Sequence, residues 1–387
     1  MRETKVLMMP SPPTSGSVGS TTKSIGIAKI LKEKGCDVRF VMSGKLGKLI
    51  QDNNFYSYPA PQPVHKTDVS EINSFTDFIR WSGMSDYTYI EEAVKSEIKA
   101  MEDFQPDVIF AETRPTATIS SKFMNISSIM VASWPCAPEF EANKNRVSEI
   151  QGFNNVLKKY NQPLVKSETE LIFSRADVKL APTLPELEPD LLNMEGVRYV
   201  GYMLDLEEKQ TIFEFENKDY PLIFIYLSVS AISPHIYQQI INETFRNEKY
   251  NVICALGYHY NGGCKESNLT NIKYFDYVSV ASIIKKTDLV IFHGGQDTMM
   301  TCLLNGVPSI VIPGRHFERA FNASQIEKAK AAKVLPVYAF RPGKLNLVVK
   351  EVLSGKYKYY SQVMSQKLKN YGGTQQCADI IIETANR

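Results

Sequence analysis

The stretch that decides the fold is residues 288–323, DLVIFHGGQDTMMTCLLNGVPSIVIPGRHFERAFNA. Residues 289–292 are apolar and partly β-branched, as a strand buried on both faces requires. Residues 293–295, His-Gly-Gly, end this run, and residues 298–304 have the pattern of a short helix. Residues 307–312 form the next apolar run. The order of strand, glycine turn, helix and strand predicts a parallel α/β unit.

The glycine turn has the chemistry of an anion site. Backbone N–H groups and the helix dipole at a helix N-terminus can hold a phosphate group. Gly294 and Gly295 allow an anion to approach the backbone, and His293 can donate a hydrogen bond to it. Thr298 can cap the helix or bind an anion oxygen. The turn therefore predicts a phosphate-binding site.

A second polar group follows the strand at residues 307–312. Glu318 lies there beside Arg319. A carboxylate can accept hydrogen bonds from several sugar hydroxyls, whereas a guanidinium favours an anion. Phosphate and sugar recognition are therefore expected close together in the sequence.

A lone His-Gly-Gly is more often an ordinary strand-to-helix turn, but the whole ordered constellation is specific. It resembles the donor-binding segment of the GT-B glycosyltransferases, in the group of UDP-glycosyltransferases and macrolide glycosyltransferases (family 1, and the C-terminal domain of family 28). That segment reads H-G-G-x-x-T, then G-V-P, then proline and an acidic residue with glutamine or arginine, then N-A. The matching residues are His293, Gly294, Gly295, Thr298, Gly306, Val307, Pro308, Pro313, Glu318, Arg319, Asn322 and Ala323.

Both halves of the chain alternate strand-like and helix-like segments, which favours parallel sheets covered by helices. The expected strands are residues 5–9, 36–42, 107–111, 128–132 and 178–181, and then 222–227, 252–256, 272–275, 289–292 and 309–312. With the resemblance, they predict an α/β protein of the GT-B type, two Rossmann-like domains facing a cleft. The expected parts are an acceptor domain (1–195), a linker (196–217), a nucleotide-sugar domain (218–360) and a C-terminal helix returning to the first domain (361–387).

The resemblance implies a set of donor-binding residues. The phosphate contacts are expected from His293, Gly294, Gly295 and Thr298, and the sugar contact from Glu318. Gln296 and Arg319 are further expected donor-binding residues. A second phosphate contact is expected from Ser228 and Ser230, for which a simple strand-end turn is an equal alternative. Tyr277 and Val278 lie where relatives present backbone to the nucleobase. Thr301 stands where relatives often have a ribose-binding glutamate, and a hydroxyl binds a diol more weakly.

The catalytic base departs from the family pattern. Many relatives have a histidine after a glycine in the first loop, where this chain has Ser20. Serine does not titrate near neutrality and needs help to act as a base. Glu112 stands where relatives place the aspartate that orients the histidine. Glu112 is thus the candidate base, and the equal structural alternative is that it only forms a cap or pairs with Arg114. His65 is next in line, although a solvated loop imidazole is its simpler interpretation.

Composition narrows the class of protein further. The chain has 44 basic and 42 acidic residues, so nothing indicates a nucleic-acid footprint. Six scattered cysteines without a C-x-x-C pair favour reduced thiols. No apolar run is long enough for a signal peptide or a spanning helix. We expect a cytoplasmic protein, with peripheral membrane contact left open.

The expected activity is transfer of a hexose-type sugar from a nucleotide-diphosphate donor, a UDP-sugar, to a hydroxyl of a small-molecule or lipid acceptor. The resemblance implies inversion and no cofactor, and the chain has no Asp-x-Asp triplet for a metal. The aromatic residues of segment 70–104 are expected as core, with an apolar acceptor pocket as the alternative. Two other functions remain open: a catalytically impaired nucleotide-sugar or partner-binding homologue, and a sugar-nucleotide epimerase.

Overall fold

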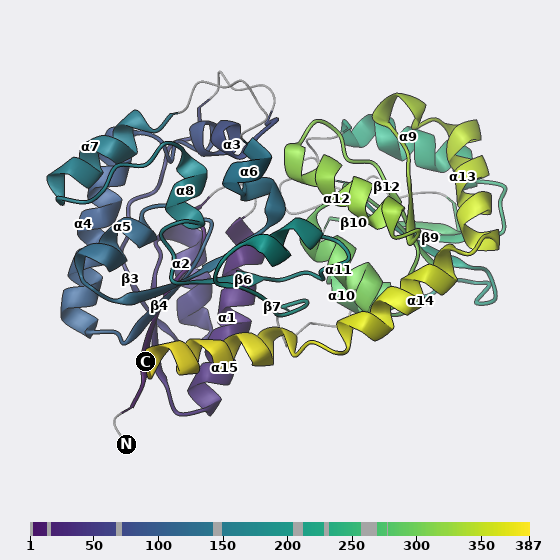
Figure 1. Ribbon diagram of the computed structural model, residues 1–387. Coiled ribbons are helices and arrows are strands. Elements are labelled where there is room, and N and C mark those ends of the chain that lie inside the picture. The colour runs from purple at the N-terminus through teal and green to yellow at the C-terminus, as the bar shows by residue number, and fades with distance from the viewer. Residues whose placement is uncertain are drawn as a thin grey trace. The chain divides into compact units, whose positions relative to one another are not determined.

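The computed structural model of the chain describes residues 3–13, 17–66, 72–141, 149–203, 212–227, 232–256, 269–276 and 278–387. The chain divides into two compact units (Figure 1). The N-terminal unit contains Met1–Leu206 and Tyr371–Arg387, and the C-terminal unit contains Glu207–Asn370. Each unit has its own parallel sheet and its own buried core.

The N-terminal unit is built on a seven-stranded sheet in the order β3-β2-β1-β4-β5-β6-β7, in which every pairing is parallel. Its strands are β1 (Lys5–Met9), β2 (Asp37–Val41), β3 (Tyr56–Tyr58), β4 (Val108–Glu112), β5 (Ser127–Val131), β6 (Val178–Ala181) and β7 (Val197–Tyr199). All five residues of β4 are buried, because helices cover both faces of a parallel sheet.

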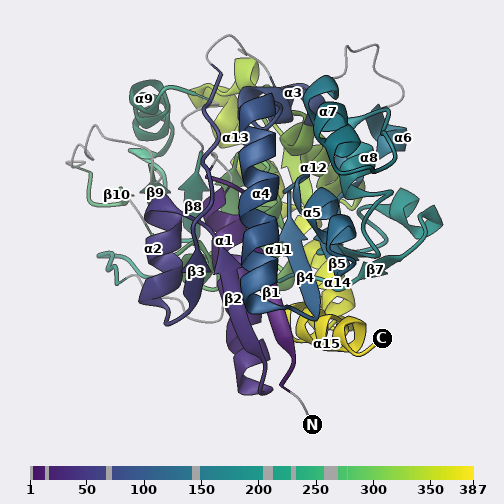
Figure 2. The same cartoon turned by 90° about the vertical axis from the view of Figure 1, so that its left-hand side faces the viewer.

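Alternate strand residues face different helix layers. Val108 and Phe110 of β4 belong to one core with residues of α1, α2 and α15, whereas α4 and α5 pack elsewhere on the sheet (Figure 2). The helices of this unit are α1 (Ser17–Glu33), α2 (Gly44–Asp52), α3 (Phe75–Trp81), α4 (Tyr87–Phe104), α5 (Ala117–Phe123), α6 (Pro138–Glu141), α7 (Gln151–Lys159), α8 (Glu168–Ile172), α15 (Gly373–Ala385) and the 3₁₀ turns η1 (Trp134–Cys136) and η2 (Pro189–Asn193).

The C-terminal unit has a six-stranded parallel sheet in the order β10-β9-β8-β11-β12-β13. Its strands are β8 (Leu222–Tyr226), β9 (Asn251–Ala255), β10 (Ile272–Phe275), β11 (Leu289–Phe292), β12 (Ser309–Val311) and β13 (Ala332–Val334). Its helices are α9 (Pro234–Phe245), α10 (Val280–Ile284), α11 (Gln296–Leu304), α12 (Phe317–Lys328), η3 (Val337–Ala339), α13 (Pro342–Ser354) and α14 (Tyr357–Leu368).

Strand order predicts where each unit binds ligands. In open α/β sheets, the crevice lies beyond the carboxyl ends of strands at the point where the order reverses. The order reverses between β1 and β4 in the N-terminal sheet, and between β8 and β11 in the C-terminal sheet. Glu112 ends β4, and His293 follows β11. The two candidate sites therefore lie at the two reversal points.

Aspartates at strand entries fix the register of both sheets. The carboxylate of Asp107 accepts from the Lys5 N–H at 2.8 Å, and that of Asp288 accepts from the Leu222 N–H at 3.0 Å. Asp177 accepts from the Ser128 N–H at 2.8 Å in the same way. In each case, an N–H from the first or second residue of one strand donates to the aspartate that precedes the neighbouring strand.

Some elements differ from the sequence expectation. Helix α1 begins at Ser17, so Ser20 lies in a helix and not in the first loop, where it was expected. Part of the expected linker forms β7, and the C-terminal segment forms two helices, α14 and α15. Within the described ranges, no helix is long and apolar enough to cross a membrane. Five cysteines are free thiols, and Cys264 lies outside the described residues.

Candidate functional site

The turn between β11 and α11 packs closely against the first turns of α12 and is hydrogen-bonded to them. Gly294 has φ +92°, and a Cβ there would lie 2.8 Å from the Arg319 carbonyl oxygen. The Asn322 side-chain amide donates to the Gly294 carbonyl at 3.0 Å. Only glycine fits this backbone and this close approach. The two separate sequence signals, His-Gly-Gly and Asn-Ala, thus form one structural unit.

Helix α11 begins directly after this turn. Gly295 is its N-cap residue and has no side chain that could cap the helix. A Cβ at Gly295 would lie 2.8 Å from Nε2 of His293, so the imidazole lies directly against the turn. The helix begins at Gln296, so Thr298 is buried in the first turn instead of capping it. Positive helix-dipole potential and an imidazole therefore meet at one place.

Burial controls the charge of this site. It lowers the pKa of His293 to about 3, with Arg319 and His316 adding repulsion, while Nδ1 lies 3.4 Å from the Tyr226 carbonyl oxygen. Burial, together with Arg319, lowers the pKa of His316 to about 4. Both imidazoles are thus neutral at pH 7, and the Arg319 guanidinium is the fixed positive charge. The pKa of Arg319 is itself lowered by burial, with Glu318 acting in the opposite direction.

The polar loop expected at Glu318 and Arg319 is the first turn of a helix. Both residues belong to α12, and His316 is its N-cap residue. Nδ1 of His316 is buried and has no hydrogen-bond partner within the described ranges. Because Glu318 and Arg319 are adjacent on one helix start, their positions are fixed by backbone geometry rather than by a flexible loop.

Other expected donor residues have different outcomes. Thr301 is 2% exposed, and its hydroxyl donates to the Asp297 carbonyl at 2.7 Å, so this hydroxyl is used by its own helix. Val278 is buried just before α10. Ser228, Ser230 and Tyr277 lie outside the described residues, and their expected roles stay predictions.

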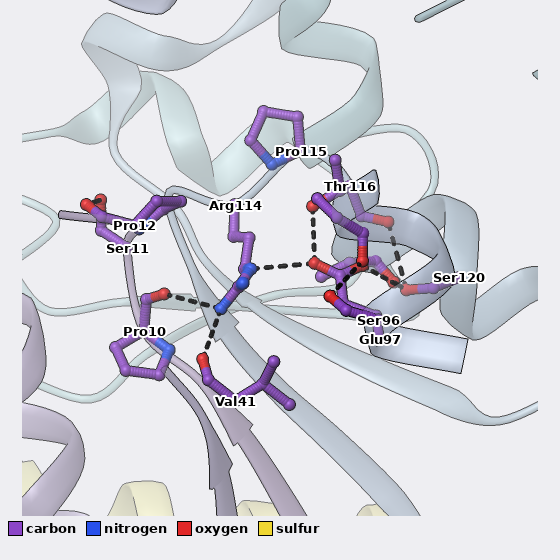
Figure 3. Close-up of polar contacts among 12 residues, drawn as sticks. Pro10, Ser11, Pro12, Val41, Ser96, Glu97, Arg114, Pro115, Thr116 and Ser120 are labelled. Carbon is purple, nitrogen blue, oxygen red and sulfur yellow. Dashed lines mark hydrogen bonds and ion pairs between the residues drawn. The ribbon is translucent and has the colours of Figure 1, made fainter. Parts of the chain in front are cut away.

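In the N-terminal unit, Arg114 pairs with Glu97 (Figure 3), whereas Glu112 pairs with Lys23. Arg114 is 1% exposed; its Nε donates to Glu97 Oε1 at 2.9 Å, and its Nη1 donates to the Val41 carbonyl at 2.7 Å and to the Pro10 carbonyl at 3.4 Å. Arg114 thereby ties together the chain beyond β1 and β2. The alternative in which Glu112 only pairs with Arg114 is therefore wrong.

Glu112 instead forms an ion pair that the sequence did not reveal. Lys23 of α1 places Nζ 2.9 Å from Glu112 Oε1, and both side chains are 10% exposed. The pair could not be predicted from the sequence, because Lys23 and Glu112 are far apart in the chain. Lys23 lies in the first turns of α1, and a buried lysine of this kind is unusual.

Ser20 belongs to a polar, buried stretch of α1. Its hydroxyl oxygen accepts from the Ser11 N–H at 3.0 Å, and the residue is 4% exposed. Thr21, Lys23 and Ser24 on the next turn are buried as well. Buried polar groups are costly to fold, so their concentration at the carboxyl edge of the sheet marks this end for ligand chemistry.

An aromatic stack extends from the chain beyond β3 into α3. The His65 ring lies 4.5 Å from the Trp81 ring, and Phe78 lies 6.1 Å from Trp81 and 6.3 Å from Phe75. Phe75 is fully buried, whereas His65 is exposed. The core interpretation of this segment thus holds for Phe75, and the outer rings form a partly open apolar surface.

Comparisons with known proteins agree with this geometry. Residues 227–377 match the glycosyltransferase family 28 C-terminal domain. The chain is 22% identical to the NDP-glycosyltransferase YjiC of Bacillus subtilis (strain 168), covering 93% of each chain. It is 27% identical to the demethyllactenocin mycarosyltransferase of Streptomyces fradiae over 42% of this chain and 35% of that protein. Among solved structures, the glycotransferase of kitacinnamycin superposes with a TM-score of 0.83 at 17% identity, covering 99% of both chains.

The fold and these relatives define a glycosyltransferase of the GT-B type. Within that class, the chain is similar to the NDP-glycosyltransferases and macrolide sugar transferases. The GT-B fold class predicted from the sequence is confirmed, and the comparisons support the predicted resemblance to this group of glycosyltransferases.

Proposed function

We propose that the protein transfers a hexose-type sugar from a UDP-sugar to a hydroxyl of an apolar small molecule, without a metal ion and with inversion at the anomeric carbon. The observation that carries this proposal is the donor turn, in which Gly294, Asn322 and Arg319 hold the N-terminus of α11 open beside His293. A nucleoside diphosphate matches this arrangement of N–H groups, imidazole and guanidinium.

The donor turn would stabilise the leaving group. As the sugar–phosphate bond breaks, negative charge grows on the diphosphate, and preorganised donors in a buried site lower the energy of that charge. The N-terminus of α11 and the Arg319 guanidinium supply positive potential, and neutral His293 supplies a hydrogen bond. Glu318, on the first turn of α12, would accept hydrogen bonds from the sugar hydroxyls.

Acceptor activation is assigned to the N-terminal unit. Glu112 at the end of β4 would take the proton of the acceptor hydroxyl while the oxygen attacks the anomeric carbon. The outer rings of the His65, Trp81 and Phe78 stack offer an apolar surface for the body of the acceptor. Solved structures of the same fold include a calicheamicin glycosyltransferase and a spinosyn rhamnosyltransferase, which is why we choose an acceptor of this kind.

Turnover with defined donors tests the proposal. The protein is incubated with UDP-sugars and dTDP-sugars in EDTA, with a panel of hydroxylated aromatic acceptors, and products are identified by mass spectrometry and NMR. The dTDP arm is included because one similar structure, VinC, is a complex with dTDP. An inverted glycoside from a UDP-sugar is the expected result. Sugar interconversion would indicate an epimerase, and binding without turnover would indicate a binding protein.

A further inference from the structure

Two buried carboxylates of the N-terminal unit differ in how they are satisfied. Glu97 uses both oxygens: Oε1 accepts from Arg114 and from the Thr116 hydroxyl at 2.7 Å, and Oε2 accepts from the Ser120 hydroxyl at 2.7 Å. Glu112 uses one: Oε1 lies 2.9 Å from Lys23 Nζ, and the buried Oε2 has no hydrogen-bond partner within the described ranges. The first arrangement is a complete structural cluster, and the second leaves one acceptor unused.

An unused carboxylate oxygen is costly in a purely structural pair, because nothing replaces the water that it loses on burial. In a site that binds a substrate hydroxyl, the same oxygen is free to accept the hydrogen bond of that hydroxyl. Glu112 continues the side of β4 that carries Val108 and Phe110 in the core with α1 and α15, and it stands at the strand-order reversal point. Lys23 reaches it from α1, one turn beyond Ser20.

The groups that face Glu112 come from several elements. Helix α1 contributes Lys23, and α15 contributes the Cys377 thiol, whose pKa is raised by burial and by the Glu112 charge. Strand β5 contributes Val131 beside it, and the nearby Arg114 is committed to Glu97. Lys23 is thus the cation that this carboxylate contacts.

We propose that Lys23 is a positioning residue for the reaction: it holds Oε1 of Glu112 so that Oε2 is the atom that receives the acceptor proton. In the step, the acceptor O–H proton moves to Oε2 and the acceptor oxygen bonds to the anomeric carbon. The bond from that carbon to the phosphate oxygen breaks, and the nucleoside diphosphate leaves with the electron pair. Glu112 then returns its proton to water. This inference rests on the proposed function.

The test compares kcat, the acceptor KM and the affinity for UDP of the wild-type enzyme and three Lys23 variants. If Lys23 positions the carboxylate, Lys23→Met misplaces Oε2 and should lower kcat by about 10²-fold, while the affinity for UDP stays unchanged. Lys23→Gln, which keeps a donor without the charge, should lower kcat similarly, and Lys23→Arg should keep most of it. Glu112→Gln should lower turnover by about 10²–10⁴-fold.

A matched control and a folding check separate positioning from general stability. Lys122→Met removes the ion pair with Asp177 in the same unit and should leave kcat unchanged. Thermal unfolding of each variant shows whether it is folded, and Lys23→Arg keeps the test open if Lys23→Met is not. An unchanged kcat in folded Lys23→Met or Lys23→Gln, with active wild-type enzyme, overturns the inference alone. No turnover by the wild type on any donor overturns the proposed function and this inference together.

Discussion

Gly294 is required in the donor turn for two reasons, its backbone conformation and the lack of space for a side chain. Its φ of +92° is unfavourable for an L-residue, and a Cβ would meet the backbone oxygen of Arg319 at 2.8 Å. Gly294→Ala must therefore strain the turn and push α12 away from it. We expect the free energy of unfolding of the C-terminal unit to fall by about 1–3 kcal/mol, with loss of UDP binding. Urea unfolding and calorimetry with UDP measure the two effects.

Gly343 provides the control in the same unit. It lies in the first turn of α13, has no positive φ, and a Cβ there meets nothing within 4 Å. Gly343→Ala should keep stability or raise it slightly, because alanine favours the helix. Equal stability of the two variants would contradict the steric role of Gly294.

A Glu318 variant tests whether the protein recognises the sugar and the nucleotide of the donor through different residues. If its carboxylate binds sugar hydroxyls from the first turn of α12, Glu318→Ala should weaken the complete UDP-sugar much more than UDP. Titration calorimetry with both ligands gives the comparison, and His293→Ala serves as the matched variant because it should weaken both ligands alike, by about 1–3 kcal/mol. Equal losses for both ligands in Glu318→Ala would make Glu318 a structural partner of Arg319.

At the scale of elements, the Arg114–Glu97 cluster holds the ends of the first strands. Arg114→Met would leave Glu97 as a buried carboxylate without its cation, and the Pro10 and Val41 carbonyls without this donor. Breaking one partner of a buried pair typically costs about 3–5 kcal/mol, so we expect a loss of that size in urea unfolding.

Two variants control this result. Glu383→Gln at the exposed Arg198–Glu383 pair should change stability little, because solvent screens exposed pairs. Arg114→Met combined with Glu97→Met should recover much of the loss, since the unpaired charge is then gone. A small effect of Arg114→Met alone would mean that water replaces the guanidinium.

The buried strands could be predicted from the sequence, and the short edge strands could not. Leu289–Phe292 is apolar on both faces and lies where expected, and Val178–Ala181 is buried along its whole length although it contains Lys179. Strands β3, β7 and β13 have three residues each, too few for a pattern of burial. The position of Ser20 inside α1 was also missed, because the first turns of this helix carry serine, threonine and lysine rather than an apolar stripe.

The candidate site also has one part that the sequence predicts and one part that it does not. The donor turn is local in sequence, and turn, helix and strand chemistry predicts it from residues 288–323. The partners of Glu112 and Arg114 are not local: Lys23 and Glu97 are brought to them by helices from other parts of the chain. Because Glu112 and Arg114 are close in the sequence, a pair between them was expected. In the structure, the two side chains belong to different polar clusters.

At the scale of the whole molecule, the two buried histidines of the donor site predict acid sensitivity. Unfolding would restore each pKa from about 3 or about 4 to its ordinary value near 6.5. Between those values, the unfolded chain binds more protons than the folded chain, so stability rises with pH there and falls as the solution is acidified below 6.5. At pH 5, each histidine should cost about 2 kcal/mol relative to pH 7.

Chemical unfolding of wild-type protein from pH 7 to pH 4.5 measures this slope. His316→Asn should flatten it by the share of one histidine, and His293→Asn should do the same. His235→Asn, on the exposed side of α9, should leave it unchanged. An unaltered slope in both donor-site variants would mean that these imidazoles are hydrated in solution. In that case they could meet a diphosphate as cations, and the assignment of the fixed positive charge to Arg319 alone would be wrong.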